Sequence, residues 1–238
     1  FACVLGLVLL NVPIAVALGV VAIAAIWLVQ GTAALPNLPI VVYNAATNFP
    51  LLAIPLFILA GAIMNASGIS SRLIAFATAL LGFIRGGLAM VSVVASMFFA
   101  GVSGSTAADT AAVGSILIPA MERRNYGKDM ATSVVACAGA IGIIIPPSIP
   151  MIILGVTAGI SIGGLFLGGF IPGILVGLAL MLTSYFFAKK RGLPAEARCT
   201  GGELWQSFKD SVLAIMTAVI ILGGILSGVF TATEASVV

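Results

Sequence analysis

One acidic side chain and one proline-rich interruption carry most of the chemistry that this sequence offers. Asp109 lies in the stretch 101–115, GVSGSTAADTAAVGS, which otherwise consists almost entirely of small residues. Farther along, an apolar stretch is interrupted by Pro146, Pro147 and Pro150, and three prolines within five residues exclude a continuous helix. Free carbonyls at the end of a broken helix suit a small cation such as Na⁺, and a helix N-terminus suits a carboxylate. The residue types therefore favour ion and carboxylate binding.

The composition predicts that both features lie in a membrane. The 238 residues are 61% hydrophobic and only 7% charged, whereas a soluble domain carries about 25% charged residues. A membrane span needs about 20 apolar residues, and long stretches of the chain carry no charge: 1–71, 86–108, 130–188 and 211–233. We therefore expect an all-α polytopic membrane protein. In such a protein an intramembrane acid marks a functional site by default.

The sequence also argues against catalysis and nucleic-acid binding. It contains no histidine, which excludes Ser-His catalysis and His-ligated metals within this chain. Residues 101–104 match the G-x-S-G of rhomboid proteases, but the histidine partner is missing, and an Asp-dyad protease would need a second intramembrane Asp. The three cysteines lack paired spacing for zinc or redox chemistry. We expect a protein that is not an enzyme and does not bind nucleic acid.

The apolar pattern predicts the elements that position these residues. Four spans are expected: 4–29, with Pro13 near one end, a short one over 51–64 that is interrupted by Pro55, a long uninterrupted one over 163–188, and 211–230. The proline-containing stretch 33–50 indicates a loop or surface helix. The stretch 73–100, interrupted at Arg85, is either one kinked helix or an interfacial piece followed by a span. Basic clusters at 123–128 and 189–191 predict two cytoplasmic turns separated by two crossings.

Two irregular segments remain between these spans. The stretch 101–115 is too polar for a lipid-facing helix and too apolar for an open loop, which favours a re-entrant hairpin over about 101–121, capped by Ser105 or Thr106. The proline segment predicts a broken helix over about 129–158. Simpler interpretations stay open: a plain kink, a packing surface of small residues, or an Asp109 that only caps a helix, because 106–109 has capping-box spacing.

Five motifs in order resemble the large membrane (M) subunit of tripartite ATP-independent periplasmic (TRAP) transporters. They are FPLLAIPLFILAG at 49–61, the small-residue stretch at 101–115, IIPPSIP at 144–150, LFLGGFIPG at 165–173 and GVFTATEA at 228–235. The resemblance runs over nearly the whole chain. It implies a multi-pass protein of the bacterial inner membrane with an inverted-repeat, elevator-type fold that contains a re-entrant hairpin and a discontinuous helix.

The resemblance also implies a mechanism and partners. Family members import organic acids such as sialic acid or C4-dicarboxylates, with Na⁺ as coupling ion and no other cofactor. A periplasmic substrate-binding (P) protein delivers the substrate, and a small membrane (Q) subunit, separate or fused, supports the large one within the lipid bilayer. The alternatives are an elevator transporter of dicarboxylates without a binding protein and a scaffold subunit that transports nothing. No residue here selects the substrate.

Carried onto this chain, the resemblance suggests domains and site residues. Residues 1–100 would form scaffold-type spans and a connecting arm, 101–188 the transport-type region with a long span at about 161–188, 189–210 a cytoplasmic inter-repeat loop and 211–238 the start of a second repeat. Because the chain begins and ends within apolar runs, we expect it to be part of a longer protein. Substrate binding is assigned to Thr106 and Pro147, and Na⁺ binding to Ser103, Gly104, Ser105, Asp109, Pro146 and Ser148.

Overall fold

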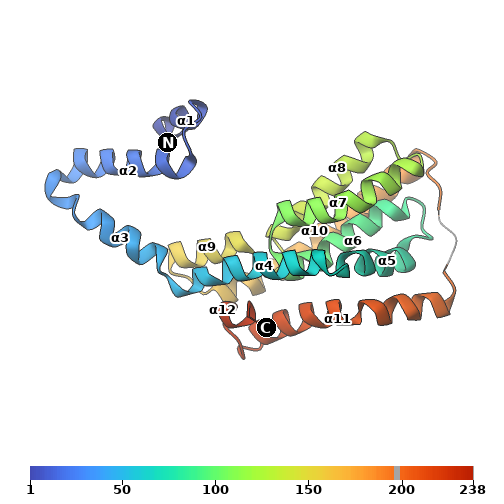
Figure 1. Cartoon of the computed structure of the whole chain (residues 1–238). Coiled ribbons are helices and arrows are strands. Elements are labelled where there is room, and N and C mark those ends of the chain that lie inside the picture. The colour runs from blue at the N-terminus through green and yellow to red at the C-terminus, as the bar shows by residue number, and fades with distance from the viewer. Residues whose placement is uncertain (196–198, 238) are drawn as a thin grey trace. The chain divides into compact units, whose positions relative to one another are not determined.

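The computed structural model describes residues 1–195 and 199–237, and within them the regular elements are all helices (Figure 1). The chain divides into two compact units, Phe1–Asn48 and Phe49–Val238. The first unit contains α1 (Ala2–Leu9), α2 (Ile14–Gln30), a short 3₁₀ turn η1 (Thr32–Ala34) and α3 (Asn37–Ala46). The division at residue 48 differs from the expected boundary at residue 100.

The single span expected over 4–29 is wrong, because the structure has two helices there. α1 ends at Leu9, and Asn11 adopts a left-handed backbone with φ 63°. Pro13 then precedes α2 in an extended conformation and restricts the residue before it. A stretch that is uniformly apolar in composition is therefore interrupted by backbone geometry.

The second unit contains the rest of the chain. Its elements are η2 (Phe49–Leu52), α4 (Ala53–Ala66), α5 (Ile69–Leu81), α6 (Gly87–Ser103), α7 (Thr106–Arg123), α8 (Lys128–Gly139), η3 (Ala140–Ile143), α9 (Ile149–Ala158), α10 (Ile162–Lys190), α11 (Gly201–Leu226) and α12 (Ala232–Ala235). Three segments of the described chain are long and apolar enough to cross a membrane: Phe49–Ala66, Ile162–Lys190 and Gly201–Leu226.

The region 73–121 contains the end of α5 and a hairpin formed by α6 and α7. Gly86, in a left-handed conformation, separates α5 from α6, so the stretch 73–100 contains two helices: the single kinked helix is excluded, and the division into two pieces agrees with the other alternative. α6 and α7 pack against each other and form a hairpin whose tip is Gly104. A helical hairpin is therefore present, and its tip lies within the expected range 101–121. Its first arm, however, is the whole of α6 rather than the short piece expected after residue 100.

The proline segment breaks its helix as expected. α8 ends at Gly139, the 3₁₀ turn η3 follows, and α9 begins only at Ile149. Figure 1 shows α8 and α9 as separate helices with different positions in the second unit. The break starts several residues before the first proline, and the ring of Pro146 would clash with the carbonyl of Gly142, four residues earlier, in a continuous helix.

The last long helix begins earlier than expected. Thr200 caps α11, its side chain accepts a hydrogen bond from the Glu203 N–H, and the Glu203 carboxylate accepts one from the Thr200 N–H. This capping box fixes the start of α11 at Gly201, so the polar part of the expected 189–210 loop is largely helical. Residues 196–198 of that loop lie outside the described residues.

Glycines on α10 allow it to pack closely against the broken helix. Gly169, Gly173 and Gly177 are spaced one turn apart, and all three are buried. A Cβ atom on Gly173 would lie 2.5 Å from the Ile145 side chain, and one on Gly169 would lie 2.5 Å from the Ile144 carbonyl oxygen. Because lipid gives apolar helices little reason to associate, such small-residue contacts supply much of the packing energy in membranes.

A glycine pair offers a test of this packing. Gly68 and Gly86 precede α5 and α6 with φ 75° and 76°, so alanine at either position should cost about 1 kcal/mol in backbone strain. Only at Gly86 would the added Cβ overlap a neighbour, the Cβ of Ala188 in α10. We expect Gly86→Ala to lower the melting temperature of the full-length protein clearly more than Gly68→Ala. Equal losses would contradict the close approach of Gly86 to α10.

Candidate ion-binding site

The hairpin tip is shaped by three consecutive residues. Ser103 ends α6, Gly104 adopts a left-handed conformation with φ 62°, and Ser105 caps α7. The Ser105 side chain accepts a hydrogen bond from the Ala108 N–H at 3.4 Å, as expected for an N-cap. The Ser105 N–H in turn donates to the Ser103 hydroxyl oxygen at 3.2 Å. The tip is therefore fixed by its own side chains.

Asp109 lies directly behind this tip and is only 1% exposed. One of its carboxylate oxygens, Oδ1, accepts a hydrogen bond from the Ser103 hydroxyl. The other, Oδ2, is buried and has no hydrogen-bond partner among the described residues, and the same is true of Thr106 Oγ1. Buried polar atoms without partners are costly in a folded protein, so these two oxygens point to a ligand.

The alternative that Asp109 only caps a helix does not describe its contacts. In a capping box the carboxylate would accept a hydrogen bond from the backbone of the N-cap residue. Here the N-cap is Ser105, and the carboxylate bonds to the Ser103 side chain in the preceding helix. Asp109 nevertheless lies in the first turn of α7, where the helix dipole stabilises its negative charge.

The broken helix meets the hairpin at its tip. The Ile149 N–H donates to the Gly104 carbonyl at 3.4 Å. A Cβ atom on Gly104 would lie 2.5 Å from the Pro147 carbonyl oxygen, so only glycine fits. Ser148 is fully buried and caps α9, and its hydroxyl donates to the Ile143 carbonyl at 2.8 Å. Two segments that are far apart in the sequence thus form one junction.

Gly142 in η3 is part of this junction, and our sequence analysis missed it. A Cβ atom at Gly142 would lie 2.5 Å from Asp109 Oδ2 and 3.5 Å from the backbone of Thr106. The unpartnered oxygen of Asp109 therefore faces the last turn before the break. The available signal was a glycine within an apolar helical segment, which often marks a close approach.

The structure brings most of the expected site residues together. Ser103, Gly104, Thr106 and Asp109 lie at the hairpin tip, and Pro147 contacts it from the break. Ser105 and Ser148 use their hydroxyls to cap α7 and α9, so their place is structural in the described contacts. Pro146 is buried next to Pro147, but the described contacts with the hairpin come from Pro147 and Ile149.

The oxygen atoms at this junction suit a hard, singly charged cation. It offers one carboxylate, one hydroxyl and several backbone carbonyls, which are ligands for alkali and alkaline-earth ions rather than for soft metals. Among the described residues there is no group of three or more His, Cys, Asp or Glu side chains close enough to hold a metal ion. The junction therefore offers a single carboxylate surrounded by neutral oxygens.

Comparison with known proteins identifies the family. The family model for the DctM component of tripartite ATP-independent periplasmic transporters matches residues 1–238. The chain belongs to this family. Its members that match the chain are permeases, and the part of the chain that the structure describes, with three long apolar helices, fits a membrane protein.

Individual TRAP permeases resemble the chain over nearly all of its length. It is 42% identical over 240 residues to the C4-dicarboxylate large permease DctM of Vibrio cholerae and 42% identical over 238 residues to the sialic acid large permease SiaM of the same species. These matches cover 100% and 98% of the chain, but 52% and 55% of the relatives. The isethionate permease DctMQ of Oleidesulfovibrio alaskensis is 44% identical over 227 residues, which cover 95% of the chain and 36% of that protein. The chain thus spans about half the length of the large permeases it matches, or less.

Proposed function

We propose that this chain is part of the large membrane subunit of a Na⁺-coupled importer of organic acids in the bacterial inner membrane. The observation that carries the proposal is the pair of buried, unpartnered oxygens, Asp109 Oδ2 and Thr106 Oγ1, at the contact between the hairpin and the broken helix. Discontinuous helices that place free backbone groups inside a membrane are a recurrent device of ion-coupled transporters.

The proposed role of the junction is to make ion binding hold two segments together. Na⁺ bound by Asp109 and Thr106, with backbone carbonyls from the break, would tie the tip of the α6–α7 hairpin to η3. Thr106 and Pro147, assigned to the substrate by resemblance, lie at the same junction. A substrate carboxylate that binds next to the ion would be attracted by the positive charge of Na⁺. Binding of the ion would then favour binding of the substrate, and the reverse.

The proposed partners and movement follow from the family. The relative from Oleidesulfovibrio is named DctMQ, which supports a Q subunit that is separate from or fused to the large subunit. In this proposal a periplasmic binding protein delivers the substrate. The α6–α7 hairpin and the broken helix would move as an elevator body relative to scaffold helices. The names of the relatives, for isethionate, C4-dicarboxylates and sialic acid, support an organic anion as the substrate class.

The test is uptake into proteoliposomes that contain the full-length protein, its small subunit and the cognate binding protein. Labelled sialic acid, a C4-dicarboxylate and isethionate are offered with an inward Na⁺ gradient imposed or withheld. We expect uptake of one of them only when both Na⁺ and the binding protein are present. Uptake with Na⁺ but without the binding protein would instead indicate a stand-alone elevator transporter. A folded complex that takes up none of them with or without Na⁺ would contradict the proposal.

A further inference from the structure

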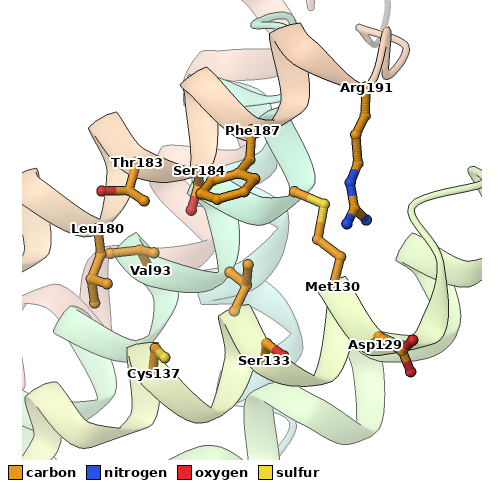
Figure 2. Close-up of a pocket in the computed structure, with 11 residues that line it drawn as sticks. Val93, Asp129, Met130, Ser133, Cys137, Leu180, Thr183, Ser184, Phe187 and Arg191 are labelled. Carbon is orange, nitrogen blue, oxygen red and sulfur yellow. The ribbon is translucent and has the colours of Figure 1, made fainter.

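A groove of about 340 Å³ runs between α8 and α10, away from the ion junction (Figure 2). Val93 of α6 lies at its floor and is fully buried. Its two walls are stripes of residues spaced one helical turn apart, Asp129, Ser133 and Cys137 on α8, and Thr183, Phe187 and Arg191 at the end of α10. The groove is therefore built by three helices of the same unit.

Charge is confined to one end of this groove. Asp129 lies at the start of α8 and Arg191 directly follows α10. Figure 2 shows the Arg191 side chain extending from the end of α10 toward α8, on the side where Asp129 lies. Among residues 1–195 and 199–237, neither side chain has an ion-pair partner. The groove thus has at one end a basic and an acidic side chain, Arg191 and Asp129, without ion-pair partners among the described residues.

The rest of the groove is largely apolar. Leu180, Val134 and the Cys137 thiol line the part that is farther along the helices from these charges. The helical rise of 1.5 Å per residue makes the wall from Asp129 to Cys137 about 12 Å long, close to the half-thickness of about 15 Å of a membrane hydrocarbon core. The basic residues around both charged ends, 123–128 and 189–191, are typical of a membrane surface. The groove therefore has a polar end at the expected membrane surface and an apolar part that extends inward.

We propose that this groove binds one phospholipid with a zwitterionic phosphate–amine headgroup. The phosphate would bind the Arg191 guanidinium, the ammonium would bind the Asp129 carboxylate, and one acyl chain would lie along the apolar walls toward Cys137. The opposite charges of Arg191 and Asp129 favour a zwitterion over a purely anionic lipid, for which Asp129 would be repulsive. Such a lipid would bridge α10 and α8, the first half of the broken helix.

The experiment is native mass spectrometry of the full-length protein with its small subunit, stripped of lipid and mixed with phosphatidylethanolamine or phosphatidylglycerol of the same acyl chains. We expect retained phosphatidylethanolamine and weaker phosphatidylglycerol binding. Arg191→Gln should lower the apparent phosphatidylethanolamine affinity about tenfold, because it removes a charge-assisted contact with phosphate. Asp129→Asn should shift the preference toward phosphatidylglycerol. Lys190→Gln, one residue away but outside the groove lining, is the control and should change neither.

A variant at the opposite end tests the acyl-chain part. Cys137→Trp should fill the apolar end and abolish the retained lipid while the melting temperature stays near that of the parent protein. The proposal is overturned if Lys190→Gln and Arg191→Gln have equal effects, or if Cys137→Trp retains the lipid. It is also overturned if the parent protein retains no phosphatidylethanolamine, which would mean that another part of the full-length chain covers the groove.

Discussion

Asp109→Asn is expected to raise the Na⁺ concentration needed for half-maximal uptake by roughly tenfold or more, because hydrogen bonds and contacts to a charged group contribute about 1.5–3 kcal/mol. The substitution keeps an oxygen that can accept the Ser103 hydrogen bond, but it removes the negative charge. Ser103→Ala should have a smaller effect of the same kind, since it keeps the negative charge of Asp109 but removes the hydroxyl that holds the carboxylate in place. Uptake measured over a series of Na⁺ concentrations checks both.

Asp210→Asn is the matched control for the loss of a carboxylate. Asp210 is exposed on α11, and its described side-chain hydrogen bond is to Gln206 at 3.2 Å. Asp210→Asn should leave the Na⁺ dependence of uptake unchanged. A second readout separates binding from folding: Na⁺ should raise the melting temperature of the parent protein, as any ligand of the folded state does, but not that of Asp109→Asn. Unchanged Na⁺ dependence in both Asp109→Asn and Ser103→Ala would refute the assignment.

Gly104→Ala is expected to reduce Na⁺-driven uptake nearly to background. At φ 62° an alanine is strained, and its Cβ would lie 2.5 Å from the Pro147 carbonyl oxygen and 3.4 Å from the Ile149 nitrogen. Neither atom belongs to a flexible side chain, so the hairpin tip must move away from the break. That movement would separate Asp109 from η3 and disrupt the proposed ion site.

Gly159→Ala separates this contact from the general cost of a left-handed alanine. Gly159 ends α9 with φ 66°, and no heavy atom lies within 4 Å of the position its Cβ would occupy. Alanine there should cost about 1 kcal/mol of stability and leave most of the uptake intact. Uptake and melting temperature are measured for both variants. If the two variants behave alike, the contact between Gly104 and Pro147 does not matter for transport.

The parts of the site that the sequence predicted are those with strong local signals. Pro146 and Pro147 remove backbone donors wherever they occur, so a break near them was expected from covalent structure alone. The helix cap at Ser105, one of the two caps expected, depends on residues only a few positions apart. These features were correct because neighbouring residues in the chain determine them.

The parts that were missed depend on contacts between distant segments or on backbone geometry within apolar stretches. Gly142 matters because Asp109, more than thirty positions earlier, lies against it, and no local pattern reports that approach. The split between α1 and α2 occurs in a stretch whose composition is apolar throughout. The early start of α11 follows from the reciprocal hydrogen bonds of Thr200 and Glu203, which outweigh the polar composition of the segment.

The contact between hairpin and break has a consequence for how such a protein can evolve. It is made largely by main-chain atoms, the Gly104 carbonyl, the Pro147 carbonyl and the Ile149 amide, and these persist whichever side chains surround them. A substitution disturbs these main-chain contacts when it adds bulk at a glycine such as Gly104. Side chains elsewhere can change without removing these main-chain contacts. The contact between hairpin and break can therefore persist while the surrounding sequence diverges over evolutionary time.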